Sequence, residues 1–250
     1  MVQRVGGWLT AAGIGLGIGF GGAMAAAQDV APPVAPPLVR PLDGSVAPAR
    51  NFAQWEKEIA AFEAKDKDSP PPTGGILFIG SSVIRLWKTL GEDFAGLPVI
   101  NRGFGGSEIA DSTHFADRII FPYAPKQIIL RAGGNDLHNG RLPSEVAEDF
   151  RQFVRVVHAR LPRTEILYLA FNPAPVRWSE CDKIRDLNRR IRAMAVEMPF
   201  VGFIDAYDVG LVPGTDTPAD VFVADRLHFN EAGYKRLTAT VRPYLPLPRR

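Results

Sequence analysis

Residues 76–87 read ILFIGSSVIRLW and place a buried strand, a turn and the start of a helix next to one another. The run ILFIG at 76–80 is apolar throughout, which is typical of a strand that is covered on both faces of a sheet. Gly80 and Ser81 end this run, and a helical pattern begins at Val83. We therefore expect Ser82 to stand at the end of a strand, with its hydroxyl presented rather than buried.

The rest of the chain repeats this alternation of short apolar runs and longer helical patterns. Further buried strands are predicted at 98–101, 127–133, 165–171 and 200–205. Helices are predicted near 83–95, 108–118, 144–161, 180–197 and 231–242, and an amphipathic helix is predicted from residue 51. Strands that alternate with helices predict an α/β fold with a parallel sheet covered on both faces. The length of 250 residues, 46% of them hydrophobic, suits one catalytic domain.

Polar and glycine-rich blocks follow these strands. In an open α/β sheet, functional groups collect outside the carboxyl ends of the strands. The turn at 101–107 contains Gly106, the block GGND at 133–136 contains Asn135, and Asp225 lies three positions before His228. Each block alone is an ordinary turn or helix cap. Together they supply a serine, a base, a partner for that base and an amide that could donate to an oxyanion.

On these blocks the chain resembles the SGNH hydrolases, also called GDSL-like esterases and lipases, over about residues 50–245. The resemblance implies Ser82 as nucleophile, although Ser81 stands where the family motif has Asp. It also implies Asp225 and His228 as the activating pair. The oxyanion hole would consist of the Ser82 N–H, Gly106 and Asn135. The implied fold is a flavodoxin-like three-layer α/β/α sandwich whose five-stranded parallel sheet has the order 2-1-3-4-5.

The resemblance implies a serine esterase that cleaves carboxylic esters through an acyl-enzyme and needs no metal or organic cofactor. Short-chain acyl or O-acetyl esters of a small molecule or a glycan are the expected substrates. Phe104 and Trp178 lie in loops that could border the substrate, and the loop at 171–181 is the expected specificity determinant. Two alternatives stay open, which are acyl transfer to a glycan and a non-catalytic carbohydrate-binding module on the same fold.

Other functional classes fit the sequence less well. No G-x-S-x-G motif of an α/β-hydrolase is present, and the His residues outside the Asp225 block, at 114, 138 and 158, stand apart from any metal-ligand motif. Lys and Arg total 29 against 27 for Asp and Glu, without basic runs, so nucleic acid is not an expected partner. A lone Cys181 can form no intramolecular disulfide. The sequence leaves the oligomeric state open.

The N-terminal residues predict export. Residues 1–27 combine Arg4, an apolar stretch and a small-residue A-x-A pattern near Ala25 or Ala27, as in a cleavable signal peptide. An uncleaved membrane anchor over 6–27 is the alternative. Residues 28–49 are Pro-rich and predict a linker, and residues 50–250 would form the SGNH hydrolase domain. The expected product is periplasmic or secreted, without stable membrane insertion after cleavage.

Overall fold

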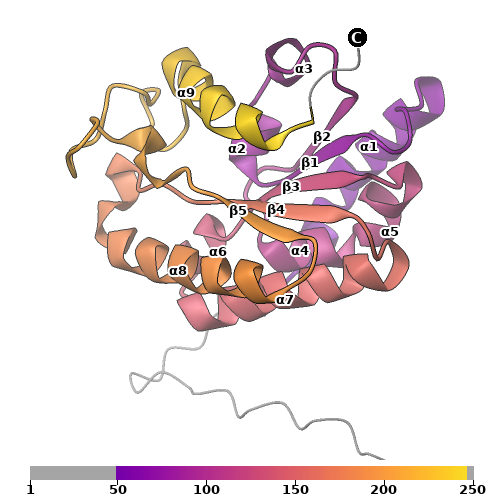
Figure 1. Ribbon diagram of the computed structural model, residues 1–250, viewed down its shortest axis with the longest axis horizontal. Helices are drawn as coiled ribbons and strands as arrows, with labels where there is room; N and C mark the ends of the chain where they lie inside the picture. The colour runs from indigo at the N-terminus through magenta and orange to yellow at the C-terminus, as the bar shows by residue number, and fades with distance from the viewer. Residues whose placement is uncertain (1–48, 247–250) are drawn as a thin grey trace, which may run out of the picture. The chain divides into compact units, whose positions relative to one another are not determined.

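The computed structural model of the protein describes residues 49–246. The predicted signal peptide, and the predicted linker except for its last residue, lie outside the described residues. Within the described part, five strands form one sheet (Figure 1): β1 (Ile76–Gly80), β2 (Val99–Gly103), β3 (Gln127–Arg131), β4 (Glu165–Leu169) and β5 (Val201–Ile204). All neighbouring pairs are parallel, in the order β2-β1-β3-β4-β5. The predicted strands and their order are confirmed.

Helices cover both faces of this sheet, so the α/β three-layer prediction is confirmed (Figure 1). One face carries α1 (Glu56–Asp68), α4 (Ile109–His114), α5 (Ala116–Ile119), α7 (Pro143–Arg160) and α8 (Cys181–Glu197). The other face carries α2 (Ser82–Arg85), α3 (Leu90–Asp93) and α9 (Glu231–Val241). The short α6 (Gly134–His138) follows β3. The 3-10 helices are η1 (Phe52–Trp55), η2 (Phe121–Tyr123), η3 (Pro175–Glu180), η4 (Tyr207–Gly210) and η5 (Arg242–Tyr244).

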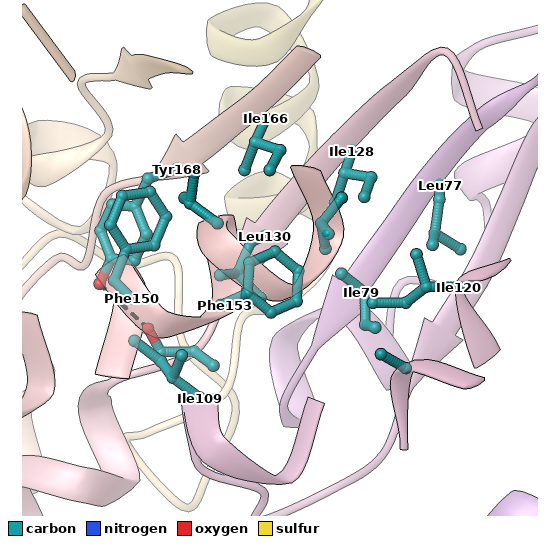
Figure 2. Close-up of a cluster of buried hydrophobic side chains, with 14 of the residues drawn as sticks. Leu77, Ile79, Ile109, Ile120, Ile128, Leu130, Phe150, Phe153, Ile166 and Tyr168 are labelled. Carbon is teal, nitrogen blue, oxygen red and sulfur yellow. Dashed lines mark hydrogen bonds between the residues drawn. The ribbon is translucent and has the colours of Figure 1, made fainter. Parts of the chain in front are cut away.

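The strands divide the core into two clusters because successive side chains point to opposite faces. Leu77 and Ile79 of β1 pack with the helices of the α7 side, whereas Ile76 and Phe78 pack with the α9 side. Figure 2 shows the first cluster, in which Phe150 and Phe153 of α7 lie against side chains of β3 and β4. Both clusters are fully buried at their centres, which explains why β1 is apolar at every position.

The predicted helix at 83–95 differs from the structure, where α2 and α3 are separate short helices. Trp87 lies between them and is buried, and its indole Nε1 donates to Asp93 Oδ2 over 2.6 Å. Thr89 Oγ1 donates to the same carboxylate oxygen over 2.7 Å. These local bonds compete with a continuous helix and favour a break at this point.

The parallel register brings the carboxyl ends of the central strands to one edge of the sheet. Gly80 at the end of β1 pairs with Gly103 of β2 and with Arg131 of β3. The segments that leave these strands therefore begin side by side, and they carry Ser82, Gly106 and Asn135.

Candidate active site

Ser82 is placed by a glycine that approaches the neighbouring strand. Gly80 has φ +136, and a Cβ at this position would lie 2.0 Å from the carbonyl oxygen of Arg131, so only glycine fits. The next residue, Ser81, donates its N–H to that same oxygen over 3.0 Å. Ser82 is then the first residue of α2, where a backbone N–H has no helical acceptor. No acceptor for the Ser82 N–H occurs among residues 49–246.

His228 reaches Ser82 from the loop before α9. Its Nε2 lies 2.9 Å from Ser82 Oγ, and its Nδ1 lies 2.6 Å from Asp225 Oδ2. With the proton on Nδ1, the imidazole donates to Asp225 and accepts from the serine hydroxyl. The side chain of His228 is 22% exposed and that of Asp225 is 48% exposed. The predicted contact between the Asp225 and His228 side chains is therefore present, and Ser82 completes a chain of three groups.

The loop at 225–228 is shaped so that Asp225 is held as a carboxylate. Its Oδ1 accepts the N–H groups of Leu227 at 2.8 Å and His228 at 2.9 Å. The backbone bond from the His228 N–H has the largest effect on the pKa of Asp225. Burial opposes it, but together with the imidazole and the Leu227 N–H it lowers this pKa to about 2. Arg226 adopts φ 58, which turns the chain tightly between the two residues.

Asn135 lies beside the turn that contains Gly106. Asn135 Nδ2 donates to the carbonyl of Ser107 over 3.1 Å, so α6 is tied to the turn after β2. Gly106 has φ +88, a conformation that favours glycine. Its N–H, like that of Ser82, has no acceptor in the described part of the chain. The second N–H of the Asn135 amide is also uncommitted in that region.

A small cleft opens beside these groups, with a cavity volume of about 50 Å³. Ser82, Asn135 and His228 all line it, and its far wall comes from the loop after β4. The other lining residues are Ser81, Val83, Arg131, Gly134, Phe171, Asn172, Ala174, Arg177, Glu180, Ile184, Leu227 and Phe229. The segment at 171–181, which the sequence suggests for specificity, thus contributes a large part of the cleft wall.

Two predicted substrate contacts lie elsewhere. Phe104 is fully buried in the core and packs edge-on against Trp55, with ring centroids 5.6 Å apart. Its backbone belongs to the turn after β2, but its side chain points into the protein and does not border the cleft. Trp178 is partly exposed and lies outside the cleft lining, where its neighbour Arg177 takes part instead. Full burial therefore corrects the prediction for the Phe104 side chain, whereas substrate contact by Trp178 stays a prediction.

Two arginines line the cleft wall: Arg131, which was not predicted, and Arg177, which belongs to the loop predicted to determine specificity. Arg131 is fully buried, donates through Nη1 to the Ala170 carbonyl, and through Nη2 to Asn172 Oδ1 over 2.6 Å. Burial lowers the pKa of Arg131 to about 10. Arg177 donates to Asn135 Oδ1 over 3.2 Å. A charged residue directly after the apolar run Ile128, Ile129 and Leu130 was the available signal for Arg131.

Residues 49–246 contain no cluster of three or more His, Cys, Asp or Glu side chains suited to a metal ion. In the same range, no helix has the length and apolar character needed to cross a bilayer. Cys181 is buried and free, and burial raises the pKa of its thiol.

The parallel sheet, with Ser82, His228 and Asp225 in contact at its carboxyl edge, has the architecture of the SGNH hydrolase superfamily. The chain belongs to the GDSL-like Lipase/Acylhydrolase family, whose model matches residues 81–236, more than half of the sequence. This match confirms the family resemblance.

Solved structures support the same fold. A protein from Streptococcus pneumonia, described as a candidate platelet activating factor, is 22% identical, with TM-score 0.69 over 78% of this chain and 94% of its own. A GDSL-like lipase from Bacteroides thetaiotaomicron is 20% identical, with TM-score 0.63 over 78% of this chain and 96% of its own. A mutant of Axe2, an acetyl-xylooligosaccharide esterase from Geobacillus, is 16% identical, with TM-score 0.56 over 72% and 99%. No curated protein sequence matches the chain.

Proposed function

We propose that this protein is a serine esterase that cleaves short-chain acyl or O-acetyl esters through an acyl-enzyme on Ser82. The observation that carries this proposal is the continuous contact from Ser82 Oγ to His228 Nε2, 2.9 Å, and from His228 Nδ1 to Asp225 Oδ2, 2.6 Å. A serine nucleophile needs a base within hydrogen-bond reach, and that base needs a partner that fixes its tautomer. A binding module would have no need of this arrangement.

In the proposed mechanism, His228 Nε2 takes the proton of Ser82 as Oγ attacks the ester carbonyl carbon. The imidazolium that forms is stabilised by the Asp225 carboxylate, which stays ionised because its pKa is about 2. His228 then gives the proton to the leaving alcohol. His228 Nε2 then takes a proton from a water molecule as the water oxygen attacks the acyl carbon. The imidazolium returns this proton to Ser82 Oγ as the bond between Oγ and the acyl carbon breaks and the acid leaves.

The oxyanion of each tetrahedral intermediate would be held by three donors: the N–H groups of Ser82 and Gly106, and Nδ2 of Asn135. The support for this assignment is that both backbone N–H groups lack an acceptor within residues 49–246. Donors that are already oriented cost no rearrangement during the reaction, and loss of one such donor typically costs about 10²–10³ in kcat.

The size of the cleft favours a short acyl group. A cavity volume of about 50 Å³ is roughly three to five times the 10–15 Å³ that one water molecule needs by the same measure. A space of this size matches an acetyl group better than a long acyl chain. The relatives named as a lipase and as an acetyl-xylooligosaccharide esterase are in keeping with ester chemistry. We further propose that residues 1–27 direct export to the periplasm or the medium.

The test is release of p-nitrophenol from acetyl, butyryl and octanoyl esters by the protein without residues 1–27, beside Ser82→Ala and His228→Ala. We expect the acetyl ester to be cleaved fastest and both variants to lose at least 10³-fold in kcat while they keep the wild-type circular dichroism spectrum. Lys183→Ala, an exposed change on α8, serves as the matched control. Activity that persists in Ser82→Ala would overturn the proposal.

A further inference from the structure

A second cavity lies next to the cleft, on the far side of Gly106. Its volume is about 310 Å³, at the lower end of the range of about 300–1,000 Å³ for small-molecule sites. Its walls come from the N-terminal segment around η1, from the turn after β2 and from the end of α6. The lining residues are Ala49, Arg50, Asn51, Gln54, Trp55, Gly106, Glu108, Asp111, Asn139 and Arg141.

The turn at Gly106 and Ser107 links the lining of the cavity to the lining of the cleft. The rim of the Trp55 indole ring lies over Gly106, because a Cβ on that glycine would be 3.2 Å from the ring. Ser107, the next residue, accepts the bond from Asn135 Nδ2. Asn135 lines the cleft and Gly106 lines the second cavity. Gly106 and Asn135 are also two of the proposed oxyanion donors, so the second cavity begins beside the position proposed for the ester carbonyl oxygen.

The walls of the second cavity combine an aromatic ring with planar polar groups. Trp55 is partly exposed, and Asn51 and Gln54, which are exposed, offer side-chain amides without a hydrogen-bond partner among the described residues. The aromatic ring can pack on the C–H groups of a ligand, and the side-chain amides can donate to and accept from its hydroxyls. These walls therefore suit a molecule with one apolar face and hydroxyls around its edge. A pyranose ring has this chemistry.

A charged network stiffens the same walls. Glu108 accepts from Arg50 at 3.1 Å, Arg141 at 3.0 Å and Asn139 at 2.9 Å. Burial would raise the pKa of Glu108, but the bonds from Asn139, Arg141 and Arg50 outweigh burial and hold it below its usual range. Arg50 also pairs with Asp149. Because carboxylates already balance the guanidinium of Arg50, the cavity favours a neutral polar ligand over a phosphate, and its polar walls do not suit an acyl chain.

We propose that this cavity, built around Trp55, Asn51 and Gln54, binds the sugar ring of a glycan ester whose acyl group enters the cleft at Ser82. The inference rests on the proposed esterase function for the acyl side, and it names the alcohol side as a carbohydrate. It makes the η1 segment, which precedes the residues matched by the family model, part of the substrate site.

The first test compares O-acetylated xylotriose with p-nitrophenyl acetate as substrates of the protein without residues 1–27. For the double variant Asn51→Ala/Gln54→Ala, and for Trp55→Phe, we expect the ratio of kcat/KM for the sugar ester to that for p-nitrophenyl acetate to fall at least tenfold. The change should come mainly from KM, because the lost contacts bind substrate and transition state alike. Lys183→Ala, an exposed change on α8 outside both cavities, is the matched control. An unchanged ratio in the double variant overturns the proposal.

A second test needs no turnover. Ser82→Ala is titrated by calorimetry with unacetylated xylotriose, cellotriose and chitotriose. We expect at least one to bind, with affinity at least tenfold weaker when Asn51→Ala/Gln54→Ala is added. If none binds while the wild type cleaves p-nitrophenyl acetate, the sugar site is refuted and the esterase stands. If a sugar binds while the wild type cleaves no ester, the binding proposal holds and the esterase fails.

Discussion

Arg177 donates from Nη1 to Oδ1 of Asn135 over 3.2 Å, while Nδ2 of the same amide donates to the Ser107 carbonyl over 3.1 Å. An amide can be turned by half a rotation, which exchanges its oxygen and nitrogen. Here both ends are engaged, and the exchanged orientation would face the Arg177 donor with an N–H and the Ser107 carbonyl with an oxygen. Arg177 therefore fixes Asn135 in the orientation that directs an N–H toward the proposed oxyanion.

This relationship predicts that Arg177 acts through Asn135. Asn135→Ala should lower kcat on p-nitrophenyl acetate by about 10²–10³, and Arg177→Met by about tenfold. If Arg177 acts through the Asn135 amide, the double variant Asn135→Ala/Arg177→Met should have the same kcat as Asn135→Ala alone. The effects of the two changes on kcat would then be non-additive. Arg177→Lys should restore part of the rate. Arg185→Met, an exposed arginine paired with Asp182 and Asp216, controls for loss of positive charge. Additive losses in the double variant would count against a positioning role.

The second prediction concerns the Asp225 carboxylate, whose support of His228 can be tested by mutation. Asp225→Asn keeps the shape of the side chain and can keep an acceptor for the Leu227 and His228 N–H groups. An asparagine has only one side-chain oxygen. If this oxygen accepts from the Leu227 and His228 N–H groups, the side-chain NH₂ faces His228 Nδ1, which can then no longer donate to this side chain. We expect kcat to fall by about 10⁴, as for a histidine held in the wrong tautomer. Steady-state kinetics check this, with thermal unfolding as evidence that the fold persists. A loss of less than tenfold would show that Asp225 does not support His228.

Much of this architecture could be predicted from the sequence, because its signals are local. Apolar runs such as 76–80 mark strands that are buried on both faces, and the residues just after them fall at one edge of a parallel sheet. Ser82, Asn135 and His228 were found in this way, and the structure brings them together around one cleft.

The errors concern side chains whose direction depends on tertiary packing. Phe104 follows β2 in the same turn as Gly106, yet its ring is buried in the core, where it packs against Trp55 of η1. Trp55 appears in the sequence only as one apolar position of an amphipathic helix. That it borders a cavity beside Gly106 results from contacts far apart in the chain, which periodicity does not encode. The same holds for the bond between Arg177 and Asn135.

Mutation of Phe104 tests whether its side chain stabilises the core or contacts the substrate. Because its side chain is fully buried, Phe104→Ala should lower the free energy of unfolding by about 3–5 kcal/mol. Phe104→Leu, which refills most of the space, should cost clearly less. Guanidinium denaturation measures both. KM for p-nitrophenyl acetate should stay at the wild-type value in Phe104→Leu. A raised KM with unchanged stability would instead place Phe104 in the substrate site.

The carboxyl of Asp136, next to Asn135, should make the stability of the protein depend on pH. Burial raises the pKa of Asp136 to about 8, and the Glu108 and Asp149 carboxylates add to the rise. Its Oδ1 accepts the N–H of Ile109 over 3.3 Å, and Oδ2 is buried without a partner in the described residues. At pH 7 the group is therefore protonated and neutral, which keeps a negative charge away from the proposed oxyanion.

The sign of the effect follows from proton binding. Between the unfolded pKa of about 3.9 and the folded value of about 8, the folded state holds a proton that the unfolded state has lost. Stability from this group is therefore complete at low pH and declines as pH rises through that window, by up to about 1.4 kcal/mol per pH unit. Asp136→Asn keeps the acceptor for Ile109 and cannot ionise, so it should remove this decline. Urea unfolding of both proteins at pH 5 and pH 8 measures the difference. Relative to the wild type, we expect Asp136→Asn to gain up to about 4 kcal/mol between these two pH values; an equal difference at both would mean that Asp136 is already ionised at pH 5.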